Sequence, residues 1–324
     1  MEARIVTDKR PTFKALLKEI RFHGNKRFCQ YIPTHASGID FELRFVKWLK
    51  NNAITKEMAK VLLRLLPQIQ FVDREDLLAL YTASFNGPIK RWFMDQLSFD
   101  FFLAQEDLKK KLKEAIDSTW FCPITDSMDI AQFHHINGIA NQDQRPPWRT
   151  LREFGDIKLI KKYMREKGFQ RIVLIEDFVG TGTQAKSVLQ FVEKDFCKEF
   201  PVLFLPLIIS QIGVERLENQ FGKVMGLYIQ KLFVLPLQVH LLKEVQIFEP
   251  SIFPALRELV DETFEDVKQP FPPEKNPLRK REKFGFGETG ALIVLFTNCP
   301  NNTLPIIWHN SPNWSALFPR VQRH

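Results

Sequence analysis

The stretch Arg171-Ile-Val-Leu-Ile-Glu-Asp-Phe-Val-Gly-Thr-Gly-Thr-Gln184 decides the fold of this 324-residue chain. Its apolar residues 172–175 predict a fully buried strand, and residues 184–191 have the periodicity of a helix. Between them stand the acids Glu176 and Asp177 and the turn Gly180-Thr181-Gly182-Thr183. A buried strand, two acids and a Gly/Thr turn that opens a helix are typical of α/β sites for a phosphorylated sugar.

The turn has the donors that a phosphate needs. N–H groups at a helix start have no intrahelical acceptor, glycines let the backbone approach an anion, and threonines add hydroxyl donors. We therefore predict a phosphate site from Gly180, Thr181, Gly182, Thr183 and Gln184. Glu176 and Asp177 suit the hydroxyls of a ribose or a phosphate-bound Mg²⁺. The alternative is an ordinary strand–turn–helix with solvated acids and a Thr N-cap. The spacing excludes a P-loop and the dinucleotide fingerprint.

The strand, acid pair and Thr-Gly turn resemble the phosphoribosyl-diphosphate motif of type I phosphoribosyltransferases. The Glu-Asp order is most similar to the hypoxanthine-guanine branch. Two further segments resemble phosphoribosyltransferase-like proteins of bacterial conflict and anti-phage gene clusters, including some retron operons: Trp120-Phe-Cys-Pro-Ile-Thr-Asp-Ser127 and Ala291-Leu-Ile-Val-Leu-Phe-Thr-Asn-Cys-Pro-Asn-Asn-Thr-Leu-Pro-Ile-Ile-Trp308. The resemblance covers roughly residues 40–320.

The resemblance implies roles for the residues of the motif. Glu176 and Asp177 match the pair that holds the ribose 2′ and 3′ hydroxyls, and residues 180–184 match the loop around the 5′-phosphate. Mg²⁺ would come with phosphoribosyl diphosphate, without direct protein ligands. Two positions depart from the hypoxanthine-guanine pattern: Gly180 replaces an Asp that assists the base, and Gln184 replaces a closing Thr. The departures put purine transfer in doubt while the phosphate pocket is retained.

Composition is that of an ordinary globular protein, with 44% apolar and 26% charged residues. No apolar run reaches ~18 residues, so no membrane span is expected, and the charged first residues predict no signal peptide. Four widely spaced cysteines are expected to be reduced thiols, which suggests a cytoplasmic protein. The net charge of +8 favours anionic partners.

The chain predicts an α/β fold: a type I phosphoribosyltransferase-like parallel sheet flanked by helices, with an N-terminal helical region. Residues 1–115 show no clear strand and could form a hood or a partner-docking surface. A helix from Asp73 is expected to end at Asn86-Gly87-Pro88. Residues 116–324 alternate between strands and helices, as parallel sheets do. Strands are expected at 119–124, 172–175, 202–210 and 291–296, and one or two more at 224–234. A loop or disordered insert is expected at 269–288.

Two further loops follow predicted strands. Thr125, Asp126 and Ser127 would lie at the carboxyl edge of the sheet with the acid pair, where the resemblance implies a pyrophosphate contact. An Asx-type turn is the alternative. Asn301 and Asn302 follow the last strand and could contact a base or ribose edge, although a turn is the better interpretation.

Other candidates have structural alternatives. Arg145, Arg149 and Arg152 could bind a pyrophosphate or lie on the surface. The pair His134-His135 points to different helix faces, which argues against a metal site. The Phe99–Leu103 cluster is expected in the core. The basic runs 109–113 and 279–283 are a solvated helix face and a loop, with nucleic-acid contact as the alternative.

Two hypotheses for function remain open. One is an anti-phage effector, expected in a retron, that binds phosphoribosyl diphosphate or a nucleotide. If active, it would be a glycosyltransferase or another nucleotide-modifying enzyme. The other is an inactive nucleotide sensor, or a docking module for a reverse transcriptase and its DNA, which Gly180 supports. Both expect partners among proteins of the same operon.

Overall fold

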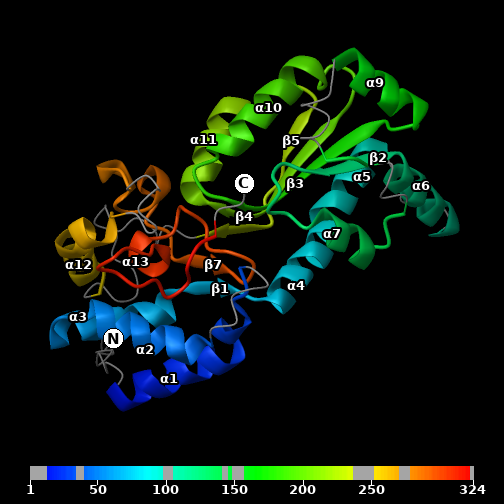
Figure 1. The fold of residues 1–324 in the computed structure, drawn as a ribbon. Coiled ribbons are helices and arrows are strands. Elements are labelled where there is room, and N and C mark those ends of the chain that lie inside the picture. Colours follow the sequence, from blue (N-terminus) through cyan, green and yellow to red (C-terminus); the bar gives the residue numbers. More distant parts are fainter. Residues whose placement is uncertain are drawn as a thin grey trace, which may run out of the picture. The chain divides into compact units, whose positions relative to one another are not determined.

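A parallel sheet carries the motif-bearing segment (Figure 1). Its strands are β2 (Thr119–Pro123), β3 (Arg171–Val179), β4 (Val202–Ser210), β5 (Leu227–Ile229) and β6 (Phe233–Leu235). The order is β2-β3-β4, and the outer edge of β4 is shared by β5, beside residues 202–204, and β6, beside residues 208–210. The strands predicted at 119–124 and 202–210 are confirmed, and the one or two strands predicted at 224–234 are present as two short strands.

This computed structural model describes residues 13–33, 40–97, 105–140, 145–147, 157–235, 252–269 and 278–321. The chain forms two compact units: the sheet unit, residues 75–237, and the terminal unit, residues 1–74 with 238–324. The boundaries of these two units differ from the single domain boundary near residue 115 that the sequence suggested. Helices from residues 75–117 pack within the sheet unit, and the last part of the chain packs with the first.

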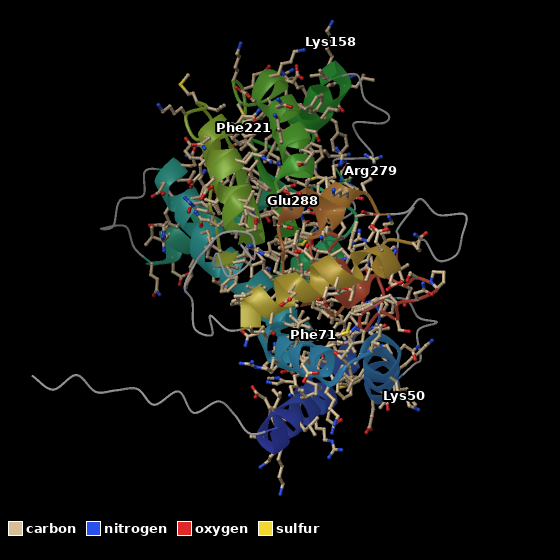
Figure 2. The ribbon with its side chains drawn as sticks, turned by 90° about the vertical axis from the view of Figure 1, so that its left-hand side faces the viewer. Lys50, Phe71, Lys158, Phe221, Arg279 and Glu288 are labelled. Carbon is tan, nitrogen blue, oxygen red and sulfur yellow. The ribbon has the colours of Figure 1, made fainter. Side chains whose placement is uncertain are left out.

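One face of the sheet is covered by α9 (Ile157–Glu166), α10 (Thr183–Asp195) and α11 (Gln211–Phe221) (Figure 1). Consecutive parallel strands joined by right-handed crossovers place their connecting helices on one face. Alternate strand residues such as Trp120, Leu174 and Phe204 pack with these helices in one buried cluster. Phe221 at the end of α11 is fully buried, whereas Lys158 of α9 projects outward (Figure 2).

The opposite face is covered by α4 (Arg74–Ser84), a π-helical turn (Phe85–Ile89), α5 (Lys90–Leu97) and α7 (Ile130–Ile136), with α6 (Gln105–Asp117) beside α5. Phe121 of β2 lies at the centre of this layer. The centroid of its ring is 6.3 Å from that of Phe85, 6.4 Å from that of Phe93 and 6.1 Å from that of Phe133. The sheet unit therefore has helices on both faces, as the predicted α/β fold requires.

Two predictions of element ends are wrong. The helix expected to stop at Asn86-Gly87-Pro88 continues through the π-helical turn into α5. Pro88 cannot donate the usual backbone hydrogen bond, and a π-helical turn absorbs this defect without ending the helix. The strand expected at 172–175 extends to Val179 because β4 runs beside it along its whole length. The acid pair therefore lies within β3.

The terminal unit packs short helices around a second, two-stranded parallel sheet. Its elements are α1 (Phe13–Lys26), α2 (Phe41–Asn52), α3 (Lys56–Leu65), β1 (Gln70–Val72), α12 (Ile252–Val267), β7 (Ile293–Leu295), α13 (Pro305–Trp308) and 3₁₀ turns at Phe28–Gln30, Leu66–Gln68, Lys280–Glu282 and Phe286–Glu288. Phe71 of β1 is buried in its core, whereas Lys50 of α2 is exposed (Figure 2).

Two expectations are corrected in the terminal unit. The strand predicted at 291–296 is present as β7, but it pairs with β1, a strand that the sequence did not predict. Three residues are too few to show a strand period, so only the distant partner reveals β1. The loop expected at 269–288 contains two 3₁₀ turns at 280–288, and Lys283 forms an ion pair with Asp261 of α12. Residues 270–277 lie outside the described residues.

Candidate functional site

The loop after β2 and the acid pair of β3 are joined by hydrogen bonds. The Thr125 hydroxyl donates to Oε1 of Glu176 at 2.5 Å, and the Thr125 amide donates to Oε2 at 3.0 Å. The Ser127 hydroxyl donates to Oδ1 of Asp177 at 2.8 Å. Asp126 lies exposed between them. The structure thus brings the predicted loop and both acids together, because parallel strands end at the same sheet edge.

The acid pair is buried, with Glu176 4% and Asp177 5% exposed. Burial, and then the negative charge of Asp177, raise the pKa of Glu176 to about 8, while the hydrogen bonds from Thr125 and Ser127 oppose the shift. Burial beside Asp177 therefore favours the protonated form of the Glu176 carboxyl. Burial and the charge of Asp177 also raise the pKa of Tyr81 in α4. The covering helix thus places a tyrosine near the acid pair, which sequence reasoning missed.

The predicted phosphate turn lies between β3 and α10. Gly182 has φ +73° and is the N-cap residue of α10, and no side chain caps the helix there. The hydroxyls of Thr181 and Thr183 are 2.9 Å apart, with Thr181 buried and both Thr183 and Gln184 exposed. First-turn N–H groups and hydroxyls of this kind are donors that an anion can accept from.

A face of α11 supports this turn, and the sequence analysis did not single it out. The Ser210 hydroxyl donates to the Gly180 carbonyl oxygen at 2.7 Å and accepts from the Gly213 amide at 3.1 Å. One turn further along, Nη1 of Arg216 donates to the Thr181 carbonyl oxygen at 2.7 Å. Small and polar residues at intervals of three after a buried strand are the signal that could have indicated this face.

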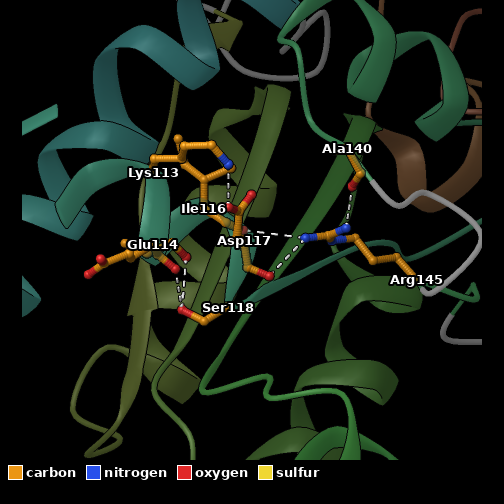
Figure 3. Close-up of polar contacts among 8 residues, drawn as sticks. Lys113, Glu114, Ile116, Asp117, Ser118, Ala140 and Arg145 are labelled. Carbon is orange, nitrogen blue, oxygen red and sulfur yellow. Dashed lines mark hydrogen bonds and ion pairs between the residues drawn. The ribbon is translucent and has the colours of Figure 1, made fainter. Parts of the chain in front are cut away.

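Arg145 has a structural role. Nε donates to the Thr119 carbonyl oxygen at 2.9 Å, and Nη2 donates to that of Asp117 at 3.1 Å. Nη1 donates to the Ala140 carbonyl oxygen, as Figure 3 shows. The side chain is 4% exposed and ties the loop after α7 to the start of β2. Arg149 and Arg152 lie outside the described residues, as does the Phe99–Leu103 cluster.

The asparagines expected near a base belong to the terminal unit. Nδ2 of Asn302 donates to the Phe286 carbonyl oxygen at 3.0 Å, and the Asn301 carbonyl oxygen accepts from the Phe286 amide at 2.8 Å. These bonds stabilise a turn between β7 and α13. A role of either asparagine in ligand contact stays a prediction.

The side chains of His134 and His135 lie in different environments, as expected for adjacent residues of a helix. His134 is buried and His135 is exposed. Neither ring nitrogen of His134 has a hydrogen-bond partner among the described residues, and Phe121 packs edge-on against the ring. Burial, and then the charge of Arg145, lower the pKa of His134 to about 4. His134 is therefore a neutral core residue.

No group of three or more His, Cys, Asp or Glu residues that could hold a metal occurs in the described part of the chain. Mg²⁺ usually keeps only one or two carboxylate ligands and takes the rest from substrate phosphates and water. Among the helices described, none is long and apolar enough to cross a membrane.

Comparison with known proteins bears directly on this geometry. The PRTase-CE family model matches residues 45–320, which include the acid pair, the phosphate turn and the loop after β2. Comparison with curated proteins found no match, and neither did comparison with solved structures. The family model covers most of the chain, and the α/β fold agrees with it. The chain belongs to the PRTase-CE family and is a phosphoribosyltransferase-like protein.

Proposed function

We propose that the carboxyl edge of the sheet unit binds a phosphorylated ribose, either phosphoribosyl diphosphate or a nucleotide. The observation that carries the proposal is the convergence of the acid pair, the uncapped start of α10 and the loop at 125–127 on one edge of the sheet. The turn at 180–184 would bind the 5′-phosphate, and the acids would bind the ribose hydroxyls.

The hydrogen bonds of Glu176 suggest how the sugar and diphosphate subsites would be coupled. Its carboxyl already accepts from Thr125, so ordering the acid pair on a ribose would also order the loop proposed for the diphosphate. Asp177 is held in the same way by Ser127. Binding of one part of the ligand therefore prepares the site for the other.

If the protein is a transferase, a nucleophile would attack C1 of the ribose while the bond to the diphosphate breaks and pyrophosphate leaves. Mg²⁺ bound with the diphosphate would neutralise charge on the leaving group. The chain itself would contribute positioning, with the acids holding the ring as C1 gains positive character. Donors from Thr125 and Ser127 would fix the orientation of those acids.

Calorimetry with phosphoribosyl diphosphate and Mg²⁺ tests binding. The parent should bind, and Asp177→Ala and Thr181→Ala should each weaken binding at least tenfold, because one loses a hydroxyl acceptor and the other a phosphate donor. Lys194→Ala, at the exposed far end of α10, is the matched control and should bind like the parent. Absence of binding to phosphoribosyl diphosphate and to all common nucleotides would overturn the proposal.

A second candidate is a nucleotide sensor without catalysis. Gly180 favours it, because no side chain at that position can assist a base, and its carbonyl oxygen is held by Ser210. Pyrophosphate release in a screen of bases distinguishes the two. Release that depends on Asp177 supports the transferase, whereas tight binding without release supports the sensor.

We also propose that the protein acts in an anti-phage system, expected to be a retron with a reverse transcriptase and its DNA as partners. The resemblance of residues 120–127 and 291–308 to conflict-system proteins supports this role. A phage challenge of cells carrying the gene with its neighbours tests it. Protection should be lost with Asp177→Ala, and equal plaque numbers with and without the intact genes would contradict the proposal.

A further inference from the structure

Arg216 is the cationic side chain that the structure fixes on the phosphate turn. It extends from α11, and its Nη1 donates to the Thr181 carbonyl oxygen at 2.7 Å and to the Thr183 hydroxyl at 3.1 Å. Both acceptors belong to the turn that precedes α10. The guanidinium is therefore anchored beside the first-turn amides by one of its three nitrogens.

The rest of the guanidinium is available to a ligand. A guanidinium has five N–H donors, and the hydrogen bonds to Thr181 and Thr183 engage Nη1 only. Within the part of the chain that the structure describes, Arg216 forms no ion pair with a carboxylate. Arg216 is exposed, so that solvent and solutes can reach its side chain.

The anchoring bonds favour an anion beside Arg216. The Thr183 hydroxyl accepts from Arg216, and its own proton can then point toward a bound oxygen. The turn otherwise supplies neutral donors and the partial positive charge of a helix start. A full positive charge at this place suits a phosphate with two negative charges better than one with a single charge.

We propose that Arg216 is a phosphate-binding residue that makes the site selective for the dianion of a terminal phosphomonoester over a phosphodiester. This inference rests on the proposed function, because it assigns the charge partner of the same 5′-phosphate. Nη1 keeps its bonds to the turn while Nε or Nη2 donates to a phosphate oxygen. The residue combines two tasks: it holds the turn and it binds the ligand.

Binding of ribose 5-phosphate by calorimetry tests the assignment. Arg216→Gln keeps a polar side chain but removes the charge. It should weaken binding about ten- to a hundredfold, the range expected for one charge-assisted hydrogen bond. Arg216→Lys should fall between this variant and the parent. Lys194→Gln removes an exposed positive charge at the far end of α10 and should leave the affinity unchanged.

A second ligand separates charge recognition from support of the turn. The methyl ester of ribose 5-phosphate is a phosphodiester with one negative charge. The parent should prefer the monoester over this diester by at least tenfold, and Arg216→Gln should lose most of that preference. Equal weakening of both ligands would show that Arg216 only supports the turn, and unchanged affinity would also overturn the inference. If the parent binds neither ligand, the proposed function fails, and the inference fails with it.

Discussion

Gly213 of α11 packs against the carbonyl oxygen of Gly180 so closely that an added Cβ would stand 2.5 Å from that oxygen. The same carbonyl oxygen accepts the Ser210 hydroxyl, and the amide of Gly213 donates to that hydroxyl. The start of α11 and the phosphate turn are therefore built as one unit. Only a residue without a side chain fits at 213.

Gly213→Ala should destabilise the protein and weaken phosphate binding. The new methyl group would displace Gly180 or the start of α11, and overpacking of this kind costs about 1–3 kcal/mol. Urea denaturation measures the loss of stability, and calorimetry with ribose 5-phosphate measures the loss of affinity. Gln220→Ala, on an exposed position of the same helix, should change neither. A Gly213→Ala protein as stable as the parent would show that this contact is not tight.

Glu176→Gln should change how stability depends on pH. The folded pKa of Glu176 is raised to about 8 from an ordinary value of 4.5. Above 4.5 the unfolded chain releases this proton while the folded protein retains it, so the parent loses stability as pH rises through this window. The variant resembles the protonated carboxyl and lacks that loss.

Melting temperatures between pH 5 and 8 measure this effect. The difference between Glu176→Gln and the parent should grow in favour of the variant as pH rises. Glu215→Gln, which removes an exposed carboxyl from α11, should leave the pH profile of the parent unchanged. Parallel profiles for Glu176→Gln and the parent would show that the buried carboxyl ionises as readily as a free one.

His134→Leu should protect the protein against acid. The folded pKa of His134 is lowered to about 4 from an ordinary 6.5, so its contribution is favourable above 6.5 and is lost as pH falls toward 4. A shift of this size corresponds to a loss on the order of 3 kcal/mol across that window. Leucine cannot be protonated, and it also removes two buried ring nitrogens that lack partners among the described residues.

Denaturant titrations at pH 7 and pH 4.5 compare the two proteins. The advantage of His134→Leu over the parent should be larger at the lower pH. His135→Leu, at the exposed neighbour, should show no such gain. If both variants lose stability with acid as steeply as the parent, His134 is not the group that titrates.

Arg145→Lys should destabilise the sheet unit without a direct effect on ligand binding. The guanidinium donates to the carbonyl oxygens of Thr119, Asp117 and Ala140, a fork that an ammonium group cannot reproduce. The loss of two buried, charge-assisted bonds corresponds to about 3 kcal/mol.

Urea denaturation measures the cost, and Arg91→Lys, at an exposed position of α5, is the matched control with an expected change near zero. Affinity for phosphoribosyl diphosphate, measured where the variant is folded, should equal that of the parent. A variant of normal stability that loses affinity would instead assign Arg145 to the diphosphate site.

The sequence indicated most of the sheet unit because its signals are local. The apolar runs that form β2 and β4, the helix periodicity at the start of α10 and the acid pair followed by a Gly/Thr turn all lie within short windows. The segments at 120–127 and 171–184 also resemble a known family, and the match over residues 45–320 confirms that relationship. The local order of strand, acids, turn and helix is therefore determined by neighbouring residues alone.

Tertiary structure decided the features that depend on residues far apart in the chain. The length of β3 depends on its pairing with β4, and β1 forms a strand only because β7 pairs with it. The helix continues past the predicted breaker at 86–88 through a π-helical turn. In the site, Thr125 reaches Glu176 across 51 positions, and Arg216 reaches Thr181 across 35. The neighbouring residues in the sequence do not indicate which distant residue each of these side chains contacts. The sequence thus indicated the turn that we propose binds a phosphate, while only the packing of α11 revealed which arginine lies beside it.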